Sequence, residues 1–281
     1  MSHRSYSQVS SYLRCPKSFE LSRVIGVPET PAWYLASGSA IHSCLEAIAK
    51  DPAVRGEALP SLWTDNFFKE IESLEERSGI TRNDWRVGGR KTKDKPDAEN
   101  YTFWLGEGIR QIELFALWLD ERIEEGWSIP ILGSNIGIEI ELNSNFGTVP
   151  VKGYADLLMT TPTGELMVID HKTGSRTPDT FQQLALYAFS MEKLGLPKPQ
   201  LGAYFMTRKA ELSNPTGFQD SDLASLTDII SNVDRAIKAE IFPAHPSSMC
   251  KSCGVASYCG AVNGAQSLEF DSIYKTKEEI A

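Results

Sequence analysis

Residues 151–174 constrain the fold most strongly, because they form two apolar runs around a Thr-Thr-Pro-Thr-Gly turn. This pattern predicts a β-hairpin. Asp156 interrupts the first run, and the second run ends in Asp170, His171 and Lys172. Side chains alternate between the two faces of a strand, so Asp170 and Lys172 point to one face and His171 to the other. If the hairpin pairs in this way, Asp156 approaches Asp170 at one edge of the sheet.

Two carboxylates at that distance repel each other, and one of them becomes neutral unless a cation lies between them. A hard divalent ion such as Mg²⁺ suits such a pair and polarises a phosphate oxygen. Lys172 would lie beside the ion, where it orients a water or stabilises charge on the phosphate. Charged residues are also common at ordinary strand ends. The Asp-x-Lys triplet alone is therefore compatible with a catalytic site and with an ordinary solvated strand end.

The rest of the chain predicts an α/β protein with a mixed core behind a helical N-terminal region. Apolar residues at helical spacing, with serine and proline at their limits, predict helices. Alternating apolar residues predict strands. The expected helices cover residues 5–15, 37–50, most of 60–126, 180–194 and 222–238, and the expected strands cover 136–142, 151–159, 165–170 and 201–207.

No apolar run approaches the ~20 residues that a membrane span needs, and the first residues are polar. We therefore expect a soluble cytoplasmic protein without a membrane partner. The net charge of −9 argues weakly against a nucleic-acid partner, but residues 82–95 contain six Lys or Arg. This segment is either a solvated loop or a DNA-binding segment. In the second case its contacts would come from Trp85, as a platform for a base, and from Arg86, Arg90, Lys91 and Lys93.

The five cysteines are too few and odd in number for a disulfide-built protein. Four of them combine a C-x2-C-x5-C group with one remote residue: Cys250, Cys253, Cys259 and Cys15. Cys44 fits a small buried hydrophobe in a helix. Structural zinc sites usually have paired C-x2-C knuckles, so four thiolates with one remote member favour a [4Fe–4S] cluster. Zinc remains the alternative, and His245 is an additional candidate ligand.

The hairpin residues 153–156 (Gly-Tyr-Ala-Asp) and 169–174 (Ile-Asp-His-Lys-Thr-Gly) resemble the core of the PD-(D/E)xK nuclease superfamily, in its RecB-like branch. Residues 38–42 (Gly-Ser-Ala-Ile-His) resemble the helix of that branch that carries a metal-binding histidine. Residues 183–187 (Gln-Leu-Ala-Leu-Tyr) resemble its Gln-x-x-x-Tyr motif. The four cysteines are similar to the iron–sulfur staple of AddB-type and CRISPR-adaptation-type nucleases. The resemblance covers residues 5 to about 260, with a poor match in the middle helical region.

This resemblance implies a restriction-endonuclease-like mixed sheet flanked by helices, with a four-cysteine cluster that joins the N- and C-terminal ends. Asp170 stands where many members have Glu, and the superfamily pattern allows both. The implied roles are Mg²⁺ or Mn²⁺ ligation by His42, Asp156, Asp170 and the backbone carbonyl of His171, water positioning by Lys172, and orientation of the lysine or phosphate by Gln183 and Tyr187. Glu139 and Glu141 lie on one face of the neighbouring strand and are either site residues or ordinary alternation.

We expect residues 1–281 to form one nuclease unit. Its parts are a helical region (1–130), the core (131–215) and a C-terminal helix with the cysteine segment (216–281). The implied function is a DNA exonuclease for single strands or DNA ends, in recombination, repair, phage replication or CRISPR adaptation. The alternatives are a non-catalytic subunit that binds nucleic-acid ends and, less favoured, a zinc scaffold. The complete set of His42, Asp156, Asp170 and Lys172 favours the enzyme.

Overall fold

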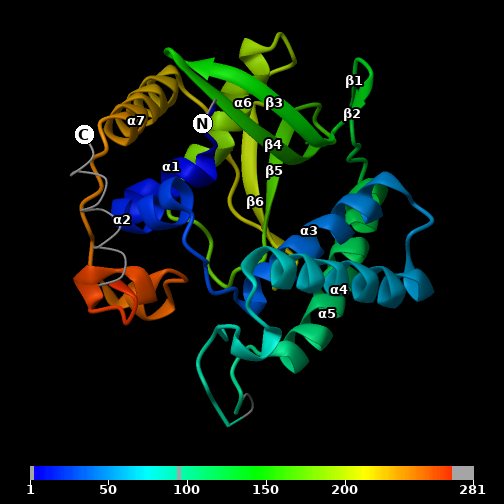
Figure 1. The fold of residues 1–281 in the computed structure, drawn as a ribbon. Coiled ribbons are helices and arrows are strands. Elements are labelled where there is room, and N and C mark those ends of the chain that lie inside the picture. Colours follow the sequence, from blue (N-terminus) through cyan, green and yellow to red (C-terminus); the bar gives the residue numbers. More distant parts are fainter. Residues whose placement is uncertain (1–2, 94–95, 268–281) are drawn as a thin grey trace.

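The computed structural model describes residues 3–93 and 96–267, which form a mixed β-sheet with helices on both faces (Figure 1). The strands follow the order β3-β4-β5-β6-β7, and β8 also pairs with β6. Their bounds are Ile138–Phe146 (β3), Val149–Thr160 (β4), Leu166–Lys172 (β5), Leu201–Met206 (β6), Glu211–Leu212 (β7) and Thr216–Gly217 (β8). A small separate hairpin precedes them, with strands β1 (Ile131–Leu132) and β2 (Asn135–Ile136). The predicted α/β fold with a mixed central sheet is confirmed.

Most of the N-terminal half is helical, as predicted. The helices are α1 (Tyr6–Arg14), α2 (Pro16–Phe19), α3 (Trp33–Lys50), α4 (Leu59–Ser78), α5 (Tyr101–Glu124), α6 (Gln182–Lys193) and α7 (Asp220–Lys238). A π-helical turn covers Glu20–Ile25, and 3₁₀ turns cover Gly56–Ala58, Arg82–Asp84, Ser248–Ser252, Ala256–Tyr258 and Gly260–Val262. Within the described ranges, none of these helices combines the length and apolarity needed to cross a membrane.

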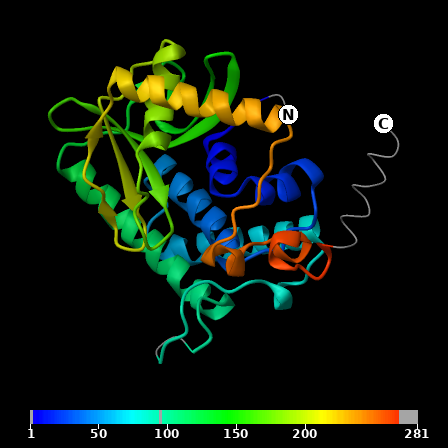
Figure 2. The ribbon, with the colours of Figure 1, turned by 90° about the vertical axis from the view of Figure 1, so that its left-hand side faces the viewer.

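The sheet separates two hydrophobic cores, each covered by its own helices (Figure 1; Figure 2). Helices α3, α4 and α5 cover one face, and α1, α6 and α7 cover the other. Alternation along β4 supplies both cores, because Leu157 and Met159 face the first and Leu158 faces the second. A strand buried on both faces is nearly all apolar. The carboxylate of Asp156 is therefore exceptional in its surroundings.

The predicted hairpin is formed by β4 and β5, with Leu157 opposite Ile169 and Thr160 opposite Leu166. After β5 the chain passes through α6 and returns as β6, which runs parallel to β5. The predicted strand at residues 136–142 begins two residues later than expected, because Ile136 pairs with Ile131 in the small hairpin.

The segment that carries the C-terminal cysteines lies beside α1 and α2 (Figure 1; Figure 2). The backbone N–H of Lys17 donates to Pro243 O at 3.3 Å, and that of Thr30 donates to Gly254 O at 2.9 Å. The ring of His245 contacts Arg14 O at 3.2 Å through Nδ1. Hydrogen bonds within the chain thus connect residues 14–30 to the segment that carries the C-terminal cysteines.

The packing of α4 on α5 depends on Gly108, because a Cβ atom there would lie 2.0 Å from the buried Trp63 ring. Gly106 lies in the same helix and has no atom within 4 Å of a built Cβ. We predict that Gly108→Ala lowers the free energy of unfolding by at least ~1–3 kcal/mol through overpacking. Gly106→Ala should raise it by up to ~1 kcal/mol through helix propensity. Urea unfolding midpoints measure both, and equal midpoints would contradict this packing.

Candidate metal centre and active site

The site lies where β4 and β5 separate. Their pairing ends at Leu157 and Ile169, while β5 remains paired with β6 through Lys172. Two residues beyond Ile169, the backbone N–H of His171 donates to Asp156 Oδ2 at 2.7 Å. The carboxylate replaces a backbone acceptor of the neighbouring strand. A gap between two strands thereby opens beside a buried acid.

Three side chains meet at this gap: His42 from α3, Asp156 from β4 and His171 from β5. One ligand atom from each lies within 4.8 Å of the others. His42 Nδ1 is 3.6 Å from Asp156 Oδ2, and His171 Nδ1 is 3.8 Å from the same oxygen. Of the groups of candidate ligands among the described residues, this is the one that meets that spacing.

The electrostatics of this group fit a divalent cation. Burial, together with the charge of Asp170, raises the pKa of Asp156 well above its ordinary value. Burial lowers the pKa of His42 and, more strongly, that of His171. Neutral imidazole is the form of histidine that binds metals. A bound cation would offset the cost of ionising Asp156 beside Asp170.

The imidazole of His171 also belongs to this group. The residue is buried, and its Nδ1 atom is the one that lies 3.8 Å from Asp156 Oδ2. Its ring lies 5.9 Å from that of His42, between centroids. The family resemblance implies only the backbone carbonyl of His171 as a metal ligand, whereas its imidazole also lies in the group. Alternation along β5 already predicts that this ring lies on the face opposite Asp170.

Four other predicted residues form a closed ring of polar contacts. Lys172 Nζ lies 2.6 Å from Asp170 Oδ2 and donates to Gln183 Oε1 at 2.7 Å. Gln183 Nε2 donates to the hydroxyl of Tyr187 at 2.7 Å, and this hydroxyl donates to Asp170 Oδ1 at 3.3 Å. Gln183 and Tyr187 are one turn apart on α6, so one helix face reaches both charged groups.

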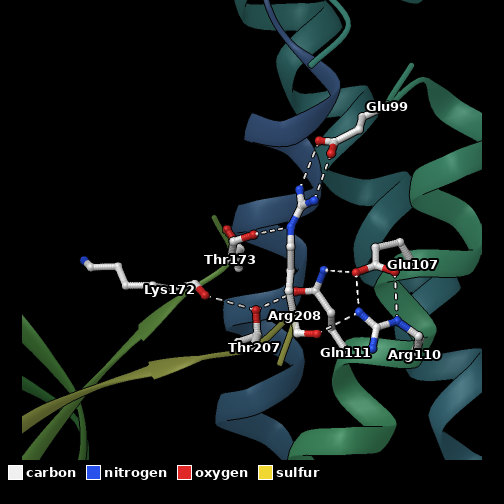
Figure 3. A network of polar contacts seen from close by, with 8 residues as sticks. All are labelled: Glu99, Glu107, Arg110, Gln111, Lys172, Thr173, Thr207 and Arg208. Carbon is white, nitrogen blue, oxygen red and sulfur yellow. Dashed lines mark hydrogen bonds and ion pairs between the residues drawn. The ribbon is translucent and has the colours of Figure 1, made fainter. Parts of the chain in front are cut away.

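The backbone of Lys172 is held from the opposite direction (Figure 3). The N–H of Thr207 donates to Lys172 O at 3.0 Å, and its hydroxyl donates to Gln111 Oε1 at 2.5 Å. Thr207 and Gln111 have no exposed surface. Next to them Arg208 Nε donates to Thr173 O at 2.9 Å, and its guanidinium binds Glu99 at 2.8 and 3.0 Å. The sequence analysis missed this support, because its members come from three distant segments.

The candidate ligands His42 and Asp156 line a cavity of about 620 Å³, which we call the metal recess. The acidic residues of its lining are Glu46, Glu139 and Asp156. Glu139 has a left-handed backbone with φ of 49°. Burial, followed by the nearby charge of Asp156, raises the pKa of Glu139 to about 7. Glu141 instead pairs with Lys152 at 2.8 Å outside the recess. Because alternation along the strand gives both glutamates the same face, the sequence pattern does not show which of them lines the recess.

Three predicted cluster ligands, Cys15, Cys250 and Cys253, line another cavity of about 200 Å³. Cys259 is half-buried in the same C-terminal segment. None of the cysteines belongs to a group with three ligand atoms within 4.8 Å, among the residues that the structure describes. Cys44 lies elsewhere, is fully buried, and has its pKa raised by burial to about 12.

Two members of the predicted DNA-binding segment need correction. Trp85 is only 5% exposed, because its ring packs 4.9 Å from that of Trp33 and its Nε1 donates to Ile80 O. It is not available as a platform for a base. The guanidinium of Arg86 donates to Thr30 O, the Tyr34 hydroxyl and Ser252 O, so it binds the protein itself. The remaining members are exposed: Arg90, Lys91 and Lys93.

Comparison with known proteins gives a family match over most of the chain. The model of the PD-(D/E)XK nuclease superfamily matches residues 3–260. The Gene 69 protein of Mycobacterium phage D29 is 29% identical over 280 residues, covering 91% of this chain and 96% of the relative. The Gene 69 protein of Mycobacterium phage L5 is 27% identical over 283 residues, covering 91% and 95%. A crystal structure of SSO0001 covers 57% of this chain and 71% of its own, with 14% identity and a TM-score of 0.31, and we draw nothing from it.

The raised pKa of Asp156 generates a prediction for the metal-free protein. A carboxyl whose folded pKa is raised stabilises the fold below its unfolded pKa, and this stability is lost as pH rises through the folded pKa. At pH 7 in EDTA, Asp156→Asn should therefore raise the melting temperature by a few degrees, at roughly 2–4 °C per kcal/mol. The amide oxygen still accepts the hydrogen bond from His171.

Adding Mn²⁺ or Mg²⁺ should reverse this order, because the ion stabilises the wild-type protein and not the variant. Thermal unfolding with and without metal measures both effects. Asp228→Asn, at an exposed position of α7, is the matched control and should change neither. A lower melting temperature of Asp156→Asn in EDTA would rule out the repulsion between Asp156 and Asp170.

Proposed function

The chain belongs to the PD-(D/E)XK nuclease superfamily, and from this premise we propose that it is a metal-dependent DNA exonuclease acting on single strands or DNA ends. Membership of the superfamily supports a nuclease with a nucleic-acid substrate. Metal dependence, the choice of DNA and the attack on ends are our proposal. Such an activity would serve recombination, repair, phage replication or CRISPR adaptation.

The observation that carries the proposal is the position of an ammonium group beside the metal-binding carboxylates. His42, Asp156 and Asp170, with the carbonyl of His171, would hold one divalent ion, and the imidazole of His171 lies in the same group as a further candidate ligand. When bound, the ion supplies Lewis-acid stabilisation of the negative charge that develops on the phosphodiester. Lys172 lies 2.6 Å from Asp170, next to this ligand set.

The side chains of the site have separate tasks in hydrolysis. Lys172 has three N–H groups, of which contacts with Asp170 and Gln183 orient two. The remaining donor is available for the attacking water or a non-bridging phosphate oxygen. The water oxygen forms the new bond to phosphorus and releases one proton to solvent as the bond to the departing sugar oxygen breaks, and that oxygen takes up a proton from solvent. Tyr187 and Gln183 keep the lysine in place through the ring of contacts.

Contacts with phosphates need local positive charge in this acidic protein. The side chains of Arg90, Lys91 and Lys93 are exposed. Their segment is connected to the end of β5, because the Glu99 N–H donates to Gly88 O and the Glu99 carboxylate binds Arg208, which in turn donates to Thr173 O. We propose that these three side chains bind the DNA backbone. We also propose that residues 1–281 work as one nuclease unit, because His42 comes from the helical region and Asp156 from the core.

We propose that Cys15, Cys250, Cys253 and Cys259 bind a structural [4Fe–4S] cluster. Three of these thiols surround a cavity of about 200 Å³. The choice of a cluster over zinc rests on the pattern of four thiolates with one remote member, since structural zinc sites usually have paired C-x2-C knuckles. The cluster would join segments that hydrogen bonds already hold together, such as that of Thr30 with Gly254.

We predict that Lys172→Ala reduces cleavage of end-labelled single-stranded DNA by roughly 10²–10³-fold, the usual effect of losing one donor to the transition state. Its melting temperature in saturating Mg²⁺ or Mn²⁺ should stay close to that of the wild type. Lys69→Ala, at an exposed position of α4, is the control and should cleave normally.

Circular single strands distinguish an exonuclease, which needs an end, from an endonuclease. Full activity of Lys172→Ala would contradict the proposed role of the lysine. A wild-type protein that binds DNA ends in the presence of metal but cuts none would favour the alternative, a non-catalytic end-binding subunit.

Protein purified without oxygen should be brown and contain iron, with little zinc. Cys15→Ser and Cys253→Ser should release the iron and yield insoluble or partly unfolded protein. Cys44→Ser should keep it, since Cys44 is buried between α3 and α4, with its thiol 3.6 Å from Leu62 O. Elemental analysis decides the matter, and one zinc per chain without iron would refute the cluster while leaving the same four ligands.

A further inference from the structure

A second cavity, of about 380 Å³, meets the active site on the other side of Asp156. We call it the fork cavity, because it lies beside β4 where β5 has separated from that strand. Its walls include Asp156, Gln183 and Tyr187, which the proposed mechanism already uses. Residues 3 and 5–7 of the N-terminal segment also line it. Its volume lies within the ~300–1,000 Å³ range of ligand pockets.

The charge of the fork cavity differs from that of the metal recess. Glu46, Glu139 and Asp156 line the recess, which suits cations. In the fork cavity Asp156 is the only acid among the described lining residues, and Lys152 contributes an ammonium group. A polyanion that reaches Asp156 through its metal ion would therefore meet less repulsion on the side of the fork cavity.

Tyr154 gives this cavity an aromatic surface. The residue is 43% exposed although it lies within β4, the strand that carries Asp156. Lys152 Nζ lies 5.3 Å from its ring centroid and 2.8 Å from Glu141 Oε1. A partly exposed ring beside an ammonium group combines a stacking surface for a base with a contact for a phosphate.

The part of the wall that the N-terminal residues form is held in place. Backbone hydrogen bonds from Arg4 to Pro150 O and from Lys152 to Arg4 O, both 2.8 Å long, attach the N-terminal residues to β4. The guanidinium of Arg4 also pairs with Asp234 of α7 at 2.8 Å, and both residues are buried. Gly153 permits the close approach of α6, since a Cβ atom there would lie 3.3 Å from the Tyr187 ring. A preformed cavity loses little entropy when it binds a ligand.

We propose that the fork cavity is a substrate subsite for one nucleotide of the DNA strand, the one that adjoins the phosphodiester to be cleaved. Its base stacks on Tyr154, and its neighbouring phosphate lies near Lys152. This inference rests on the proposed nuclease function and adds the contacts that hold the strand beside Asp156. The exposed segment with Arg90, Lys91 and Lys93 is a separate contact.

The test compares Tyr154→Ala and Tyr154→Phe with the wild type in steady-state cleavage of single-stranded DNA. Tyr154→Ala should raise KM by roughly tenfold, equivalent to about 1.4 kcal/mol, and leave kcat within about threefold. Tyr154→Phe should restore KM, because stacking needs the ring and not the hydroxyl. Phe68→Ala, which removes a ring of similar exposure from α4, is the control and should leave KM unchanged.

Substrate changes separate a direct contact from a structural effect. Oligonucleotides with one abasic residue, scanned through positions around the first cleaved bond, should include one that raises the wild-type KM by the same factor. For that substrate Tyr154→Ala should add no further loss, because the two changes remove the same contact. Unchanged KM in Tyr154→Ala, or losses that simply multiply for every abasic position, would overturn the subsite.

Binding measurements distinguish failure of this inference from failure of the nuclease proposal. Fluorescence anisotropy of a labelled oligothymidylate, with Ca²⁺ in place of Mg²⁺, reports the affinity without cleavage. A wild-type protein that cleaves, with an affinity independent of Tyr154, keeps the nuclease and loses the subsite. A protein that binds through Tyr154 without cleaving keeps the subsite and loses the nuclease. Absence of both binding and cleavage refutes both.

Discussion

The hydrogen bond from the His171 backbone to Asp156 Oδ2, 2.7 Å long, is the contact on which the candidate site depends. It ends the pairing of β4 with β5 and replaces it with a side-chain acceptor, so the strands separate while β5 stays on β6. The gap gives access to Asp156 from two cavities. The same carboxylate is buried near Asp170, which raises its pKa, and a bound divalent cation would offset the cost of ionising it.

Lys172 is held through its backbone carbonyl and through its ammonium group, and these contacts fix an otherwise flexible side chain in one position. Its carbonyl accepts from buried Thr207, and its ammonium group contacts Asp170 and Gln183. The next residue, Thr173, is tied through Arg208 to Glu99 (Figure 3). The end of β5 is thereby connected to the segment with the exposed Arg90, Lys91 and Lys93. If Lys172 acts in catalysis as proposed, fixing it through its neighbours lowers the entropy lost when substrate binds.

Residues whose geometry depends on one strand or helix could be inferred from sequence. The alternation of β5 separates His171 from Asp170 and Lys172, and the spacing of Gln183 and Tyr187 gives them one face of α6. Residues whose role depends on packing could not. Trp85 stands in a basic segment, yet its ring packs on Trp33. Glu139 and Glu141 alternate identically, but the positive φ of Glu139 marks a local irregularity beside Asp156, and only Glu139 lines the metal recess.

The amino-acid sequence by itself determined the longer helices and strands, the hairpin and the superfamily, because these follow from periodicity and from short motifs along the chain, whereas the two-residue strands β1, β2, β7 and β8 gave no such pattern. Only the tertiary structure decided how distant segments meet: the histidine of α3 at the hairpin, Gln111 and Thr207 behind Lys172, and residues 3 and 5–7 at the cavity that Tyr154 lines. Such contacts join residues more than a hundred positions apart in the extreme cases. Local patterns do not specify them, since they arise when the whole core packs.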